Sequence, residues 1–239
     1  MNSLVQVPLN IGLDDCSSFE NFYVGQNQEL INALHAFLQS ESDTVFFLWG
    51  ERGVGKTHLL QSCLQASDLH KVDNNNVCHL DFENTSLSPS SLLEMMDDKV
   101  LLCLDHIKYV LDDELWLESL FHCFNDLKQR FGKIIVTAEA SPLHLNIKLN
   151  DLRSRFAWGD IYQVQPLSDE DKIKALQLRA SLRGLTLGDD VAKYLLSRMP
   201  RNMKDLFSVF ESLDVASLVA KRAITIPFVK QALLSKEWV

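Results

Sequence analysis

Glycine and proline are scarce in this 239-residue chain, with 9 and 6 residues, which excludes a collagen-like or low-complexity protein. No apolar run approaches the roughly 18 residues that a membrane-spanning helix needs. The densest apolar runs are short, at residues 45–49 and 100–104. The first ten residues, MNSLVQVPLN, lack the basic and apolar regions of a signal peptide. We therefore expect a cytoplasmic protein that makes no membrane contact.

The chain also has no CxxC pair, and its five cysteines are odd in number and scattered. This spacing indicates neither a zinc site nor a disulfide framework. We expect reduced thiols, most of them buried.

Positive charge is in deficit, since 23 Lys and Arg face 32 Asp and Glu, for a formal net charge of −9. The acidic excess lies before residue 150, and the remainder is slightly basic. Clustered cations are what nonspecific DNA binding requires. The charge balance therefore argues against a stand-alone DNA-binding domain.

Strand-like and helix-like segments alternate in the first two thirds of the chain. Short apolar runs predict strands at 44–50, 76–82, 100–105, 133–137 and 161–164. Helical spacing predicts helices at 27–38, 58–69, 88–96 and 112–131. Alternation of this kind indicates a parallel α/β sheet flanked by helices.

After Pro166 the chain predicts helices only: one from Ser168, then 190–198, 202–213 and 226–234. A capping-box pattern, SDED, opens the first of them, and Gly184 is its candidate C-cap. We therefore divide the chain into an extended tail at 1–18, an α/β nucleotide-binding domain at 19–166 and a small all-α lid domain at 167–239.

The nucleotide assignment depends on the segment GERGVGKT at 50–57, which follows a predicted buried strand and precedes a helix. It matches GxxxxGK[ST], the phosphate-binding loop, whose glycines turn backbone N–H groups toward phosphate oxygens. Lys56 supplies a positive charge to the β- and γ-phosphates, and the Thr57 hydroxyl can coordinate Mg²⁺. The predicted phosphate-binding residues are Gly50, Gly53, Val54, Gly55, Lys56, Thr57 and His58.

A second acidic element follows one β/α unit later, in VLLCLD at 100–105. A carboxylate at the end of a buried strand, here Asp105, can hold Mg²⁺ through water. The next residue is His106, at a position where many P-loop ATPases carry a second acid that polarises the attacking water. We therefore expect weak or no intrinsic ATPase activity.

Several segments resemble the DnaA/Hda family of AAA+ ATPases. FENFYVGQNQEL (19–30) is similar to the opening of the ATPase domain, TAEASP (137–142) to the sensor-1 region and SRFAWG (154–159) to the arginine-finger motif. ITIPFVKQALL (224–234) resembles the end of the lid, and we expect no helix-turn-helix domain after it. The resemblance covers residues 6–234 and is strongest toward Hda-type regulatory inactivators of DnaA. It implies an AAA+ P-loop domain followed by a helical lid.

The resemblance also implies roles for single residues. Phe22 would border the adenine pocket, and Glu139 would stand at the sensor-1 position. Lys204 would be the sensor-2 cation of the lid, a place that Arg201 could also take. Arg155 would be the arginine finger, which points to the ATP of a neighbouring protein; the alternative is an ordinary salt-bridged arginine.

The tail residues Gln6-Val7-Pro8-Leu9-Asn10-Ile11 resemble the peptide by which Hda and DNA polymerases bind the bacterial sliding clamp. Gln6 would hydrogen-bond at the rim of the clamp pocket, and Leu9 and Ile11 would fill its apolar part. The partner would be the β sliding clamp of DNA polymerase III, with DNA and the nucleoid reached through the clamp.

Two functions remain open from the sequence. In the first, the protein holds ADP (or ATP, with Mg²⁺) as a structural ligand and supplies Arg155 to the ATP of DnaA, which prevents re-initiation of replication. In the second, it is a self-contained AAA+ ATPase or helicase loader that acts on DNA through Lys56, Thr57 and Asp105. The stacking usual among AAA+ subunits also leaves a homo-oligomer open.

Overall fold

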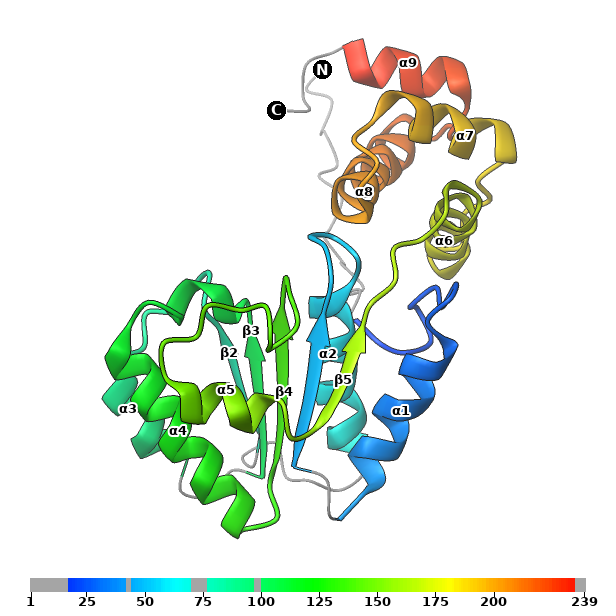
Figure 1. Cartoon of the computed structure of the whole chain (residues 1–239). Helices are drawn as coiled ribbons and strands as arrows, with labels where there is room; N and C mark the ends of the chain where they lie inside the picture. Colours follow the sequence, from blue (N-terminus) through cyan, green and yellow to red (C-terminus); the bar gives the residue numbers. More distant parts are fainter. Residues whose placement is uncertain (1–16, 42–43, 70–76, 97–99, 235–239) are drawn as a thin grey trace, which may run out of the picture. The chain divides into compact units, whose positions relative to one another are not determined.

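The computed structural model describes residues 17–41, 44–69, 77–96 and 100–234. The chain divides into two compact units, Ser17–Leu167 and a second one within Ser168–Val239 (Figure 1). The predicted boundary, after residue 166, lies one residue from this division. The predicted clamp-binding residues Gln6, Leu9 and Ile11 lie outside the described residues.

A five-stranded parallel sheet forms the centre of the first unit, in the order β2-β3-β4-β1-β5. The strands are β1 (Val45–Trp49), β2 (Val77–Asp81), β3 (Leu101–Asp105), β4 (Lys133–Ala138) and β5 (Asp160–Gln163). Each predicted strand is confirmed to within two residues, and so is the parallel α/β class.

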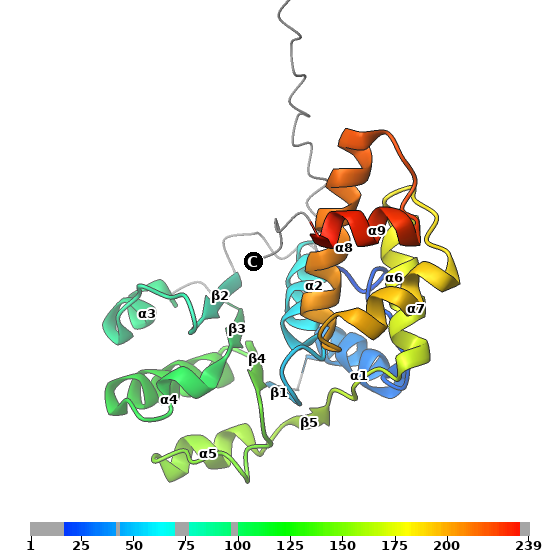
Figure 2. The ribbon, with the colours of Figure 1, turned by 90° about the horizontal axis from the view of Figure 1, so that it is seen from above.

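Helices cover both faces of the sheet (Figure 2). On one face lie α1 (Gln28–Gln39) and α2 (Lys56–Leu69); on the other lie α3 (Pro89–Met95), α4 (Glu114–Gln129) and α5 (Asn150–Phe156). A short 3₁₀ helix, η2 (Ile107–Val110), follows β3.

Side-chain alternation along the strands explains the two layers. In β1, Val45 and Phe47 enter the core shared with α3, α4 and α5, whereas Phe46 and Leu48 enter the core shared with α1 and α2. All four side chains are buried. A strand buried on both faces reads as a continuous apolar run, which is why periodicity of two is absent from its sequence.

The strand order makes the carboxyl end of β1 the natural ligand site. β1 lies between β4 and β5, and the chain leaves it to return at the far edge as β2. In open α/β sheets, ligands bind at the carboxyl ends of the strands where such a reversal occurs. The GERGVGKT segment starts at that point.

The second unit is helical, with α6 (Asp169–Leu182), α7 (Asp189–Arg198), α8 (Met203–Ala220) and α9 (Ile226–Leu234). Ser168 caps α6 by accepting a hydrogen bond from the Asp171 amide, as the capping-box pattern predicts. Gly184, with φ +71°, follows the same helix in the left-handed conformation of a C-terminal cap. Buried side chains of all four helices form one apolar core.

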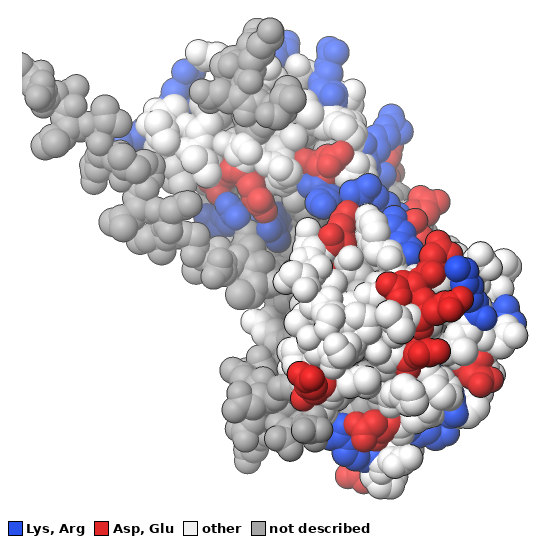
Figure 3. Space-filling model, turned by 90° about the vertical axis from the view of Figure 1, so that its left-hand side faces the viewer, with Lys and Arg blue, Asp and Glu red and all other residues white. Residues whose placement is uncertain are grey.

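The described residues agree with three expectations from the composition, which concern membrane spans, cysteines and acidic charge. None of the helices described is long and apolar enough to cross a membrane. The four cysteines in the described part, Cys63, Cys78, Cys103 and Cys123, are buried thiols outside any disulfide, as expected. Figure 3 shows acidic side chains gathered on one side of the α/β unit, beside a broad uncharged area.

Candidate functional site

The phosphate-binding segment turns sharply between the end of β1 and the start of α2. Gly53 and Gly55 have φ of +81° and +103°, values that side chains with a Cβ rarely adopt. A Cβ on Gly55 would also lie 2.8 Å from the Phe22 ring. The backbone of this loop therefore depends on its glycines.

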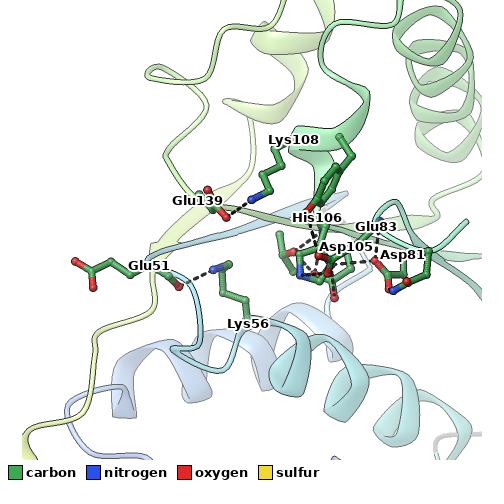
Figure 4. A network of polar contacts seen from close by, with 11 residues as sticks. Glu51, Lys56, Asp81, Glu83, Asp105, His106, Lys108 and Glu139 are labelled. Carbon is green, nitrogen blue, oxygen red and sulfur yellow. Dashed lines mark hydrogen bonds and ion pairs between the residues drawn. The ribbon is translucent and has the colours of Figure 1, made fainter. Parts of the chain in front are cut away.

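Lys56 lies at the N-terminus of α2 with only 8% of its surface exposed. Its Nζ donates hydrogen bonds of 2.8 Å to the carbonyl oxygens of Gly50 and Glu51 (Figure 4). Burial lowers the pKa of Lys56, and the nearby Glu139 and Asp105 carboxylates oppose that effect. No acidic residue occupies the first turn of α2, so the positive end of this helix is available to an anion.

The segment before α1 lies against this loop. The Phe22 ring packs at Gly55 and, at 5.4 Å between centroids, on the ring of His58. His58 Nε2 lies 2.9 Å from the carbonyl oxygen of Ser18. The structure thus brings Phe22 and His58 to the loop, with His58 tying the preceding segment to α2.

Asp105, at the end of β3, is buried and fixed by its neighbours. Thr137 Oγ1 and the His106 amide both donate to Asp105 Oδ1. The other oxygen, Oδ2, is buried without a hydrogen-bond donor among the described residues, although His106 Nδ1 lies 3.5 Å away. A buried carboxylate oxygen in this condition suits a bound cation or its water shell, so the residues fit Mg²⁺.

A magnesium ion at this place would also need ligands from the nucleotide. No group of three or more His, Cys, Asp or Glu side chains in the described part of the chain could hold a metal ion alone. Mg²⁺ is typically bound by one or two protein groups together with phosphate oxygens. Thr57 and Asp105 are the protein groups available for this arrangement.

His106 sits in a left-handed backbone conformation, with φ +56° and ψ +44°, and turns its ring toward acidic residues. Its Nδ1 lies 2.9 Å from Asp81 Oδ1, and its Nε2 lies 4.0 Å from Glu83 Oε2 (Figure 4). Partial burial acts to raise the pKa of Asp81, but hydrogen bonds from Asn84, His106 and the Glu83 amide hold it below its usual value.

Sequence reasoning missed Asp81 and Thr137. Asp81 is the last residue of β2 and Thr137 the last but one of β4, the two strands beside β3, and Asp81 is the register partner of Asp105. The carboxyl ends of adjacent parallel strands meet at one edge of the sheet. Polar residues at the ends of the predicted strands 76–82 and 133–137 were therefore the available signal.

Glu139 follows β4 at the same edge and forms an ion pair with Lys108 of η2 (Figure 4). The hydrogen bond between them lowers the pKa of Glu139 and raises that of Lys108. Glu139 therefore stays ionised near the phosphate-binding loop, with its charge compensated by a residue that the sequence did not single out.

Arg155 lies on α5, on the sheet face opposite α2 (Figure 2). Its guanidinium carbon lies over three aromatic rings, at 4.3 Å from the Trp158 centroid and 5.4 Å from those of Phe121 and Phe124. No carboxylate of the described residues lies within ion-pair distance of it. The alternative of a salt-bridged arginine does not describe this residue.

The remaining predicted residue, Lys204, belongs to the second, helical unit. Lys204 is exposed in the first turn of α8, after the N-cap Asn202. Arg201 pairs with Asp169 at 3.2 Å within the lid. Of the two candidate sensor-2 cations, Lys204 is the one whose charge is not engaged within the described part of the lid.

Solved structures of DnaA and RuvB share this fold. Domain III of Thermotoga maritima DnaA matches with a TM-score of 0.78 and 21% identity, over 98% of this chain and 99% of that one. AMPPCP-bound DnaA from Aquifex aeolicus matches at 0.71 and 23%, over 85% and 66%. The Thermotoga maritima RuvB branch migration motor matches at 0.65 and 19%, over 87% and 69%.

Family comparison gives the finer assignment. Residues 13–163 match the bacterial DnaA ATPase domain, and residues 169–233 match the lid domain of Hda. The first match alone spans more than half of the chain. The protein therefore belongs to the DnaA/Hda family of AAA+ proteins.

Proposed function

We propose that this protein regulates replication initiation by stimulating hydrolysis of the ATP bound to DnaA. Its own P-loop holds ADP, or ATP, as a structural ligand, with Lys56 and the amides of α2 at the phosphates. Thr57 and Asp105 would hold Mg²⁺, which shields phosphate charge when it is bound. Phe22, packed against Gly55, would close the base side of the site.

The observation that carries this proposal is the state of Arg155. It is a partly exposed cation without a carboxylate partner in the described residues, held on aromatic rings. It lies on α5, on the opposite face of the sheet from α2. The phosphates of the protein's own nucleotide would lie at the N-terminus of α2. Arg155 is therefore suited to a phosphate on another molecule, where an arginine finger can raise the hydrolysis rate by about 10³–10⁵.

The N-terminal tail would bring the protein to the place where DnaA acts. Residues 6–11 would bind the β sliding clamp on DNA, which raises the local concentration of the protein near DnaA. DNA would then be contacted through the clamp, consistent with an acidic chain. The match of the C-terminal helices to the Hda lid supports this type of regulator.

The central test measures ATP hydrolysis by DnaA in the presence of DNA-loaded clamp and this protein. Arg155→Ala should abolish the stimulation and leave ADP binding and clamp binding unchanged. Arg153→Ala is the matched control, because Arg153 lies on the same helix and donates to Asn150 instead. Full stimulation by Arg155→Ala would exclude Arg155 as the finger.

Nucleotide extraction from the purified protein tests the ligand role, and recovered ADP would support it. Alanine at both Gln6 and Leu9 should abolish clamp binding without changing the circular dichroism spectrum. Unaltered clamp affinity of that double variant would refute the role of the tail.

A second function, that of a self-contained ATPase or helicase loader, is favoured by one observation. The P-loop glycines, Lys56 and the buried Asp105 lie where they would be needed to hold a nucleotide with magnesium. Turnover of the isolated protein, measured with and without single-stranded DNA, separates the two functions. Substantial DNA-stimulated turnover that Lys56→Ala removes would favour the loader.

A further inference from the structure

The Arg155 guanidinium is held by aromatic rings from two segments of the chain. Phe121 and Phe124 come from α4, whereas Trp158 follows α5 in the same turn of chain as Arg155. Trp158 is the closest of the three, and its own ring meets Phe124 edge-on at 6.4 Å. The indole therefore lies against both the arginine and α4.

Buried side chains of α5 anchor the backbone that carries Arg155 and Trp158. Leu152 and Phe156 are fully buried, and Phe156 packs on Phe47 of β1. The Trp158 amide donates to the carbonyl oxygen of Arg155 at 3.1 Å. Arg155 and Trp158 thus project from a rigid turn, and freedom remains mainly in their side chains.

Trp158 is 57% exposed, so part of its indole ring is open to solvent. Its ring also carries a second cation, the Lys128 ammonium at 4.2 Å from the centroid. Neither Lys128 nor Arg155 has an acidic partner within the part of the chain that the structure describes. Cation–π contact with the indole, rather than an ion pair, therefore restrains both cations.

We propose that Trp158 is a positioning residue for Arg155. The Trp158 ring holds the guanidinium extended, and keeps water from one side of it, before the guanidinium meets a phosphate. The inference rests on the proposed finger role of Arg155. An ion pair would hold the arginine by its charge and would compete with phosphate. An aromatic ring orders the side chain and leaves the charge and the N–H donors available.

Kinetics with two variants at this residue test the inference. Exposed cation–π contacts correspond to about two- to five-fold in an equilibrium. Trp158→Ala should therefore lower the maximal rate of DnaA ATP hydrolysis by at least that factor, with an unchanged half-saturating concentration. Trp158→Phe should restore most of the rate, because it keeps an aromatic face. ADP affinity should stay constant in both.

Lys128→Met is the matched control, because it removes the second cation from the same ring and keeps the aliphatic stem. It should leave the maximal rate unchanged. An unchanged or raised maximal rate in Trp158→Ala, or equal losses in Trp158→Ala and Trp158→Phe, would overturn the inference.

A spectroscopic measurement separates this inference from the proposed function. The chain has four tryptophans, so 5-fluorotryptophan labelling gives few ¹⁹F resonances, and Trp158→Phe assigns one of them. Arg155→Ala should shift that resonance in the protein without DnaA, and an unshifted resonance would overturn the stacking. If Arg155→Ala shifts the resonance but still stimulates DnaA fully, the finger role is contradicted and the contact between Trp158 and Arg155 stands.

Discussion

Gly159 is the position in the finger motif where substitution should damage the fold most. It follows Trp158 and precedes β5, and a Cβ built on it would lie 2.0 Å from the carbonyl oxygen of Val45. The Val45 Cβ and carbonyl carbon would lie at 2.6 and 2.7 Å. Since these atoms belong to the start of β1 and include its backbone, no side-chain rotation can relieve the clash.

The displacement gives the size of the effect. Ordinary contact begins at 3.4 Å, so Gly159→Ala needs a shift of about 1.4 Å between the turn and β1. Overpacking of this kind costs about 1–3 kcal/mol, and a backbone clash belongs at the upper end. At about 2–4 °C per kcal/mol for a chain of this length, the melting temperature should fall by about 6–12 °C.

Thermal unfolding followed by calorimetry and circular dichroism is the assay. Gly188→Ala is the control, because its Cβ would meet only the tip of the Asp190 side chain, which can rotate away. The control should lower the melting temperature by no more than about 4 °C, the cost of losing a modest N-cap residue. A Gly159→Ala protein that melts within about 1 °C of wild type would refute the packing argument.

Two further predictions concern the nucleotide site. Gly55→Ala combines a φ of +103° with the approach to Phe22, so ADP affinity measured by calorimetry should fall about ten-fold or more; unchanged affinity would contradict the assigned loop geometry. The pKa of Glu139 is lowered by Lys108, so the stabilisation from this pair should be present above the ordinary pKa near 4.5 and lost as pH falls through the lower folded value. Urea unfolding of wild type and Glu139→Gln should therefore converge on acidification, and a stability difference that grows toward low pH would refute the pairing.

Strands were predictable here because each is a short apolar run bounded by polar residues, as Val45–Trp49 illustrates. Helix α5 was not predicted, because its seven residues carry only two buried side chains, Leu152 and Phe156. A pair of apolar residues four apart is too little periodicity to separate from a loop. Helix α8 was predicted to end seven residues too early, since Val215, Leu218 and Val219 continue the helix on its exposed side.

In the candidate site too, some residues could be predicted from local sequence and others could not. The phosphate-binding loop is a local motif, so its residues were predictable from their spacing. The partners of Asp105 and Arg155 depend on strand register and on packing between α4 and α5, which a sequence does not display. Thr137 lies 32 residues from Asp105, and Phe121 lies 34 from Arg155.

The surroundings of His106 depend on the register between β2 and β3. The sequence indicates only that His106 replaces an acid. In the structure, acidic residues do surround it, but each has a partner: Asp81 faces the His106 ring, and Glu83 accepts a hydrogen bond from the Tyr109 hydroxyl at 3.0 Å.

Asp105 Oδ1 is likewise engaged, which leaves Oδ2 as the buried carboxylate oxygen without a donor in the described network. One such oxygen suffices to hold magnesium through water, but a base for the attacking water requires a second acceptor. The arrangement supports the proposal that this protein retains its nucleotide rather than hydrolysing it. It also agrees with the proposed action of Arg155 on a nucleotide of another protein.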